Sequence, residues 1–158
     1  MSGYRIERLS NHHNRKAFRC GSEPLDLYFR QRATQDEQRR IALCFVAVAE
    51  PDDTVAGFYT LAATSIALDG LPVERARRLP RYPSVPAVLL GRLAVASTHQ
   101  GKGLGGALVA DALLRAAQSE IVGHLMVVDA QDEVAKRFYV HLGFEVLPED
   151  DRRLVRRI

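Results

Sequence analysis

Gln100-Gly101-Lys102-Gly103-Leu104-Gly105-Gly106 is the stretch that decides the fold class of this chain. An apolar run from Val85 to Val95 precedes it and an apolar periodic segment from Leu104 to Ala117 follows it, which predicts a strand, a glycine-rich turn and a helix. Because glycines lack Cβ atoms, backbone N–H groups at such a helix start can approach an anion closely, and the helix dipole adds partial positive charge there. The stretch therefore predicts a phosphate or pyrophosphate site.

The order of residues in this turn does not match the P-loop of nucleoside triphosphatases. That motif needs Ser or Thr after its lysine, and Lys102 is followed by Gly103. The order here is Gln-x-x-Gly-x-Gly. The alternative is a flexible turn without a ligand, but a junction between a strand and a helix favours anion binding over that alternative.

Length and composition indicate an ordinary globular protein. The 158 residues, 47% hydrophobic and 26% charged, predict a single domain spanning 1–158. The longest apolar run, Ile41 to Ala49, is too short to span a membrane, and the N-terminus lacks a signal-peptide core, which predicts a cytoplasmic protein without membrane contact. Cys20 and Cys44 have no metal or redox spacing and are expected to be reduced.

The basic charge of the chain is carried almost entirely by arginine. The net charge is +3, and only three of the 22 basic residues are lysines. Arginine binds phosphate bidentately and stacks on bases, so a phosphate-rich partner is one interpretation. A codon bias toward arginine is the other, and composition does not choose between them.

Hydrophobic periodicity predicts an alternation of strands and helices, hence a mixed sheet of six to seven strands flanked by helices. The paired His12 and His13 fall in a polar loop and are expected to be solvated, with no metal bound. Ser22 is expected to cap a helix. The expected strands are Tyr4–Leu9, Ile41–Glu50, Thr54–Leu68, Val85–Val95, His124–Ala130, Phe144–Leu147 and Leu154–Ile158, and the expected helices run from Ser22 to about Arg40, from Gly103 to about Gln118, and from Asp132 to Gly143.

Two motifs at this spacing resemble the GCN5-related N-acetyltransferase (GNAT) family. They are Gln100-x-x-Gly103-x-Gly105 after an apolar strand, and Ala135-Lys136-Arg137-Phe138-Tyr139-x-x-x-Gly143-Phe144. The resemblance covers nearly the whole chain. It implies a GNAT fold in which two neighbouring strands splay apart around acetyl-coenzyme A (acetyl-CoA).

The resemblance also implies which residues contact this co-substrate. Backbone groups of Leu93, Ala94 and Val95 would pair with the pantetheine arm, and Phe138 would lie beside the cofactor. The pyrophosphate would be held by Gln100, Gly101, Lys102, Gly103, Leu104, Gly105 and Gly106. Tyr139 would lie near the sulfur.

Acetyl transfer to an amine needs a neutral amine, a polarised thioester carbonyl and a proton for the departing thiolate. A tyrosine with a pKa of about 10 can protonate a thiolate whose pKa is about 8.5. Periodicity alone favours a packing role for Tyr139, whereas the family motif indicates the catalytic acid. His99, Asp129, Asp132 and His141 are candidate bases by residue type only. An α-amine, with a pKa of about 8, needs no strong base.

A narrower resemblance is to the acetyltransferase toxins of bacterial type II toxin–antitoxin modules. It rests on four segments: Leu25–Phe29, Gly57–Ala62, Leu79–Pro83 and Leu90–Val95. It implies acetylation of the α-amine of aminoacyl-tRNA, a homodimer, and neutralisation by a ribbon-helix-helix antitoxin. The tRNA contacts expected from charge are Arg30, Arg39, Arg40, Arg77, Arg78, Arg81 and Arg92. Arg92 is equally well explained as a structural ion pair.

Two features depart from this pattern: Ala96 stands where an acid is expected, and the tail Arg152–Ile158 is unusually basic. Two other functions remain open. One is a housekeeping acetyltransferase for a small amine or a protein N-terminus, and the other is a non-catalytic binding module that uses the arginines. The sequence does not identify the tRNA, the dimer interface or the antitoxin's binding mode.

Overall fold

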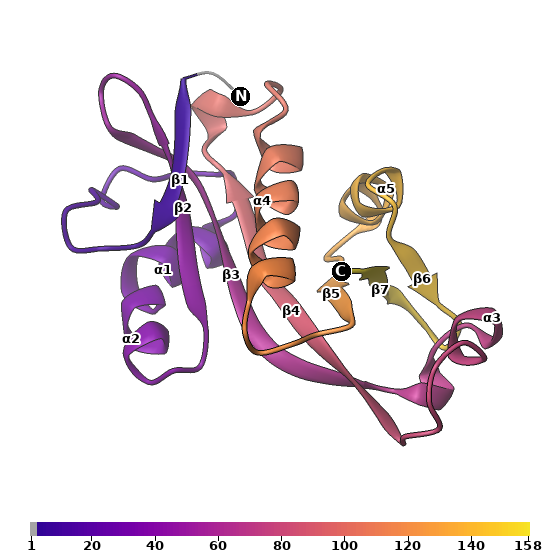
Figure 1. Cartoon of the computed structure of the whole chain (residues 1–158). Coiled ribbons are helices and arrows are strands. Elements are labelled where there is room, and N and C mark those ends of the chain that lie inside the picture. Colours follow the sequence, from indigo (N-terminus) through magenta and orange to yellow (C-terminus); the bar gives the residue numbers. More distant parts are fainter. Residues whose placement is uncertain (1–2) are drawn as a thin grey trace. The chain divides into compact units, whose positions relative to one another are not determined.

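The computed structural model describes residues 3–158 as a mixed α/β chain (Figure 1). The strands are β1 (Tyr4–Arg8), β2 (Leu43–Ala49), β3 (Thr54–Ala67), β4 (Ser84–Val95), β5 (Leu125–Asp129), β6 (Glu145–Leu147) and β7 (Asp150–Arg157). The helices are α1 (Glu23–Gln31), α2 (Ala33–Gln38), α3 (Val73–Ala76), α4 (Leu104–Gln118) and α5 (Glu133–His141), with 3-10 turns η1 (Leu68–Gly70) and η2 (Ser97–His99).

The strands form one seven-stranded sheet in the order β1-β2-β3-β4-β5-β7-β6. β4 and β5 are parallel, whereas β1 with β2, β2 with β3, β5 with β7 and β6 with β7 are antiparallel. This confirms the predicted mixed sheet and both predicted hairpins. The residues of β2 from Cys44 to Ala49 are all buried, on both faces of the sheet. This burial explains why the strand reads as an uninterrupted apolar run instead of an alternating one.

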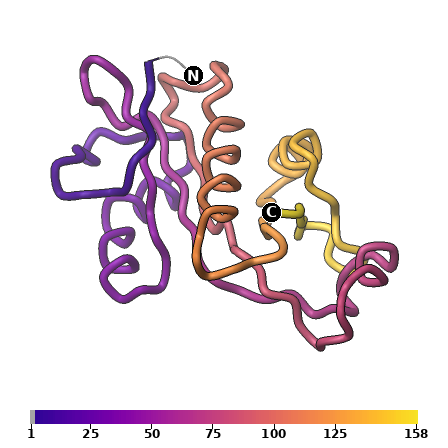
Figure 2. The backbone as a smooth tube through the Cα atoms, in the orientation of Figure 1, coloured from indigo at the N-terminus to yellow at the C-terminus, as the bar shows by residue number. Residues whose placement is uncertain are grey.

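Contacts along the chain group into two compact units. The first comprises the chain up to Ala62 together with Gly91–Ala112, and the second comprises Ala63–Leu90 and Leu113–Ile158. The long strands β3 and β4 contribute residues to both. Figure 2 traces the backbone from its N-terminal to its C-terminal end. The expectation of a single domain stays a prediction.

The core of the first unit is aromatic. Phe29 and Phe58 stack with their ring centroids 4.3 Å apart, and Phe18 packs edge-on against both. Such pairs add to the stability gained from burial. Ala94 and Ala96 belong to this cluster, so the end of β4 and the residue after it are anchored on a rigid base.

The core of the second unit is aliphatic. It is built from strand residues and one residue of the connector between β3 and β4: Ile66, Leu71, Val85, Ala87, Leu125, Val127, Leu147 and Val155. In this unit β4 and β5 form a parallel ladder, in which Ala87–Leu90 pair with Leu125–Val128. The last five residues of β4, Gly91–Val95, are not part of that ladder.

Three local predictions are wrong. The helix expected from Ser22 to Arg40 breaks at Arg32, where φ is −119°, although neither glycine nor proline marks the break. The Ser22 side chain makes no capping hydrogen bond. His13 is buried, with 7% of its surface exposed, because both ring nitrogens find partners. In contrast, the Asp132 carboxylate caps α5 by accepting the Ala135 N–H at 2.8 Å.

No helix within residues 3–158 is both long enough and apolar enough to cross a membrane. Both cysteines are free thiols. Burial raises the pKa of Cys20 to about 11 and that of Cys44 to about 12, so both are neutral at physiological pH.

Candidate active site

The glycine turn between β4 and α4 has the geometry of an anion cradle. Gly101 and Gly103 have φ values of +77° and +80°, a region that residues with a Cβ rarely adopt. A Cβ placed on Gly101 would meet no atom within 4 Å, so the space beside the turn is open. α4 then begins at Leu104, which is buried together with Leu108 and fixes the helix start.

The side chain of Gln100 holds this turn in place. Its amide nitrogen donates to the carbonyls of Val95 and Cys20, both at 3.0 Å. The predicted pyrophosphate residue therefore uses its amide group as an internal brace, which leaves the turn's backbone N–H groups as the donors for an anion. Nothing in the sequence pointed to Cys20 as a partner, because it lies 80 positions away.

The segment between β4 and the turn is tied to neighbouring chain by backbone hydrogen bonds. Ala96 N–H donates to the Ala56 carbonyl and Ser97 N–H to the Arg19 carbonyl, each at 2.7 Å. Ala96, which stands where an acid was expected, is 6% exposed, so this position is occupied by a core residue. A carboxylate placed there would be buried and costly.

Arg92 is fixed at both ends. Its backbone N–H donates to the Thr60 hydroxyl at 3.1 Å, and its guanidinium carbon lies 3.7 Å from the centroid of the Tyr28 ring. No carboxylate among residues 3–158 forms a salt bridge with it. The expectation of a structural ion pair is therefore wrong, because a cation–π contact takes its place.

Tyr139 lies on α5 with its ring buried and its hydroxyl at the surface. The ring packs edge-on against Phe138 and Phe144, at centroid distances of 5.1 and 5.4 Å. Among the described residues its hydroxyl has no hydrogen-bond partner, yet it is not a buried unpaired atom, so it reaches solvent. Burial of the ring raises the pKa of Tyr139 to about 12.

Residues 41–146 match the family model of the acetyltransferase (GNAT) domain. The chain belongs to the GNAT family. It is therefore an N-acetyltransferase by family, and the resemblance expected from its two motifs is confirmed.

Several of the proteins to which the chain is similar are toxins. The chain is 38% identical to a tRNA-acetylating toxin of Mycobacterium tuberculosis (strain ATCC 25618 / H37Rv), over 98% of this chain and 93% of that one. It is similar to AtaT complexed with acetyl-methionyl-tRNAfMet, with a TM-score of 0.88 and 30% identity over 98% of this chain and 94% of that chain. A tyrosine-to-phenylalanine mutant of AtaT, bound to the C-terminus of the antitoxin AtaR and acetyl-CoA, matches with a TM-score of 0.79 and 27% identity over 98% and 93%.

Three of the four candidate general bases of this GNAT protein make other contacts. The Asp129 carboxylate accepts two hydrogen bonds from Arg153, at 2.7 and 2.9 Å. Asp132 caps α5, and His99 Nδ1 is hydrogen-bonded to the Tyr4 hydroxyl at 2.7 Å. His141 lies exposed in the last turn of α5. These contacts agree with a reaction that uses an amine already partly neutral.

The arginines expected to contact tRNA fall into both units of this GNAT chain. Arg30 donates to the Phe18 carbonyl at 2.9 Å and supports the loop before α1. Arg77 pairs with Glu74 at 3.4 Å. Arg39, Arg40 and Arg81 are exposed.

Arg78 lines a polar pocket of about 420 Å³ in the second unit. Arg75 lines it too, as does Arg157 of the basic C-terminal tail. The other lining residues are Glu74, Leu79, His124 and Glu145. Arg75 is held by Glu145 at 3.1 Å. Burial, followed by the charges of Arg157 and Arg75, lowers the pKa of His124, which agrees with a positive local potential.

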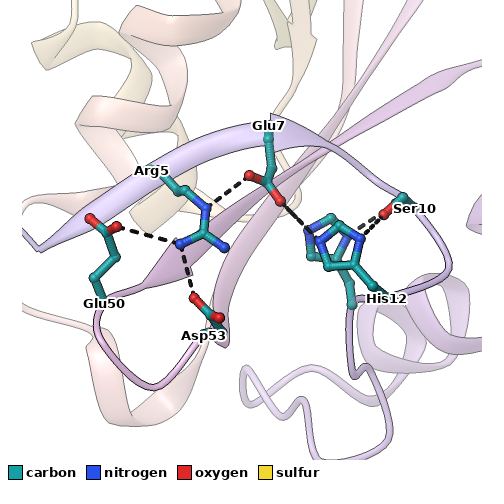
Figure 3. A network of polar contacts seen from close by, with 7 residues as sticks. Arg5, Glu7, Ser10, His12, Glu50 and Asp53 are labelled. Atoms are coloured by element: carbon teal, nitrogen blue, oxygen red, sulfur yellow. Dashed lines mark hydrogen bonds and ion pairs between the residues drawn. The ribbon is translucent and has the colours of Figure 1, made fainter.

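A second polar cluster lies at the end of β1, where Glu7 links Arg5 to His12 and His13 (Figure 3). The carboxylate and imidazole atoms lie within 4.8 Å of one another, a spacing that a metal could use. However, His13 Nδ1 accepts the Ser10 N–H at 3.0 Å, so its Nε2 carries the proton donated to Glu7 at 2.6 Å. His13 therefore has no lone pair left for a metal in this arrangement.

The Glu7 contacts predict a loss of stability in acid. The hydrogen bond from His13, followed by that from Arg5, holds the pKa of Glu7 below its usual value near 4.5. The contribution of ionised Glu7 to the free energy of unfolding is complete above pH 4.5. It disappears as the pH falls through the lowered pKa of Glu7 in the folded protein. We expect Glu7→Gln to be less stable than wild type at pH 7, with the difference shrinking toward pH 3. Urea unfolding at several pH values measures this difference in stability. Glu149→Gln, at an exposed position, is the control and should show no pH-dependent difference from wild type. A difference between Glu7→Gln and wild type that does not change with pH contradicts the prediction.

Proposed function

We propose that this GNAT protein is a cytoplasmic toxin that transfers the acetyl group of acetyl-CoA to the α-amine of aminoacyl-tRNA and thereby inhibits translation. The observation that carries the proposal is the match over nearly the whole chain to a tRNA-acetylating toxin and to AtaT with its acetylated tRNA. By the same similarity we propose a homodimer, neutralised by a ribbon-helix-helix antitoxin.

The residues of the first unit fit acetyl-CoA. The pyrophosphate would bind the backbone N–H groups between Gly101 and Gly106, where positive φ angles and open space allow close approach. Leu93, Ala94 and Val95 lie outside the ladder between β4 and β5, so their backbone groups suit a pantetheine arm added as a strand. Bound acetyl-CoA supplies the activated acetyl group.

The protein's own contribution is to orient, polarise and donate a proton. The backbone N–H of Leu93 would stabilise negative charge on the thioester oxygen. Its strand is held by hydrogen bonds on either side of Leu93 in the sequence, at the Arg92 N–H and the Val95 carbonyl. The Tyr139 hydroxyl, protonated at every physiological pH, would give its proton to the departing thiolate. The α-amine, with a pKa of about 8, attacks in its neutral form. The proton that its nitrogen sheds as the amide forms goes to solvent, and the Tyr139 phenolate left after thiolate protonation takes a proton back from solvent.

The test is acetyl transfer to defined acceptors. The purified protein is incubated with acetyl-CoA and a charged tRNA pool, and aminoacyl-adenosines released by nuclease are analysed by mass spectrometry. We expect N-acetylated aminoacyl-adenosine with wild type and little with Tyr139→Phe. Acetylation only of small amines or peptide N-termini supports the housekeeping enzyme, and transfer to no acceptor supports a binding module.

The pocket lined by Arg78 and Arg157 predicts a salt-dependent tRNA contact. Neither arginine forms a salt bridge with a carboxylate of residues 3–158, so each is available to a phosphate. We expect each alanine substitution to weaken tRNA binding and to reduce the slope of log affinity against log salt by about one. Glu74→Gln, which removes a negative charge from the same pocket, should strengthen binding. Unchanged affinity in all three variants, measured by fluorescence anisotropy, contradicts a tRNA contact here.

A further inference from the structure

Arg92 presents an unpaired cation at a defined place on β4. The residue is exposed, while the Tyr28 ring beneath its guanidinium is only 8% exposed. A distance of 3.7 Å between the guanidinium carbon and the ring centroid places the group against the ring face. Face contact uses none of the guanidinium N–H donors, which all lie in its plane.

The ring under Arg92 is itself held on two sides. The Tyr28 hydroxyl donates to the Asp36 carboxylate at 2.8 Å, which ties α1 to α2. The same ring lies nearly parallel to Phe58, at an interplanar angle of 18° and a centroid distance of 6.4 Å. Tyr28 therefore provides a fixed surface, and Asp36 sets its orientation.

The backbone of Arg92 is fixed as well. Its N–H donates to the hydroxyl of Thr60, a residue that is 1% exposed. The guanidinium is thus oriented by the protein and faces solvent without forming a salt bridge to a carboxylate of residues 3–158. An arginine oriented in this way is suited to bind a phosphate or a carboxylate through two parallel hydrogen bonds.

We propose that Arg92 binds a phosphate at the acceptor end of aminoacyl-tRNA, and that Tyr28 and Asp36 position it. This rests on the proposed function. Strand residues advance about 3.3 Å each, so the Arg92 backbone lies within about 10 Å of Leu93, Ala94 and Val95, where the acetyl-CoA arm is proposed to bind. In an aminoacyl-tRNA the amino acid's carboxyl group is esterified. The anions left near its α-amine are the terminal phosphates.

Kinetics with two acceptors test the proposal. One is an aminoacyl-tRNA, and the other is the same aminoacyl group joined to adenosine through a stable 3′-amide, without any phosphate. We expect Arg92→Ala to raise KM for the tRNA by roughly tenfold or more, since hydrogen bonds to charged groups are strong, and to leave kcat and the KM for the adenosine derivative unchanged. Arg92→Lys should fall between, because lysine keeps the charge without the planar fork.

The positioning residues are tested by paired substitutions. Tyr28→Phe keeps the aromatic face and should keep most of the affinity for tRNA, whereas Tyr28→Leu removes the face and should raise KM for the tRNA alone. Asp36→Asn should behave like Tyr28→Phe. Arg32→Ala is the matched control, because Arg32 is an exposed arginine of the same unit. An equal effect of Arg32→Ala and Arg92→Ala, or an equal rise in KM for both acceptors, overturns the proposal.

The phosphate site and the proposed reaction are tested separately by measuring binding of an RNA hairpin that ends in CCA and carries no amino acid. If wild type acetylates aminoacyl-tRNA but Arg92→Ala binds the hairpin as tightly as wild type, the Arg92 site is wrong and the proposed function stands. If wild type binds the hairpin through Arg92 but acetylates no aminoacyl-tRNA, the proposed reaction is wrong and the phosphate site stands.

Discussion

Tyr139→Phe is expected to lower kcat by roughly 10²–10⁴-fold, the usual contribution of a general acid. The substitution removes only the hydroxyl, which has no hydrogen-bond partner within residues 3–158. The ring contacts with Phe138 and Phe144 are kept, so the fold should be preserved. Affinity for acetyl-CoA should change little, since the proton is needed only as the thiolate departs.

Steady-state kinetics, a calorimetric Kd for acetyl-CoA and thermal unfolding together test this prediction. Tyr82→Phe is the matched control, because Tyr82 is 69% exposed and belongs to no proposed site. A Tyr139→Phe enzyme with wild-type kcat contradicts the assignment of the acid. A fall in kcat together with a lower unfolding temperature indicates instead that the hydroxyl stabilises the fold.

Periodicity predicted most of the architecture because the segments that decide it are strongly patterned. The apolar run that ends at Ala49 contains the buried strand β2, the run that ends at Val95 forms the partly buried strand β4, and both hairpins follow from the order of the elements. The glycine spacing alone was less specific. Gly101, Gly103 and Gly106 also satisfy the Gly-x-Gly-x-x-Gly order of dinucleotide-binding turns. The antiparallel pairs β1–β2 and β5–β7, in the same sheet as the parallel pair β4–β5, distinguish this fold from a dinucleotide-binding one.

The supports of the site could not be predicted, because they join residues far apart in the chain. Gln100 bonds to the carbonyl of Cys20, and Arg92 lies against Tyr28, an α1 residue that helical spacing marks only as apolar. The burial of His13 was not predicted either, although its partner Glu7 lies only 6 positions away, because nothing in the sequence indicates that Glu7 faces it from β1. A sequence pattern indicates which face of an element is buried, but it does not indicate which polar groups meet.

Gly57→Ala is expected to destabilise the protein by about 1–3 kcal/mol, the usual cost of overpacking, and to weaken acetyl-CoA binding. Gly57 lies in β3 beside an irregularity in the pairing with β2, and a Cβ there would lie 2.8 Å from the Ala94 carbonyl oxygen and 3.1 Å from Leu108 Cδ1. The first contact is with backbone, which cannot rotate away, so β4 has to shift. The shift falls on the backbone proposed to hold the pantetheine arm.

Gly70→Ala is the matched control for this change. The nearest atom to a Cβ at Gly70 is 4.0 Å away, and this residue also has no positive φ, so its stability and cofactor affinity should stay near wild type. Urea unfolding gives the difference in stability, and a Kd for acetyl-CoA measured well below the unfolding temperature reports on the folded protein alone. If Gly57→Ala lowers stability but leaves the Kd unchanged, β4 moves without disturbing the cofactor. In that case the proposed contact between the Ala94 backbone and the pantetheine arm is wrong. Unchanged stability as well contradicts the close approach of β3 to β4, because an added methyl group at 2.8 Å from a carbonyl oxygen cannot be accommodated without displacement.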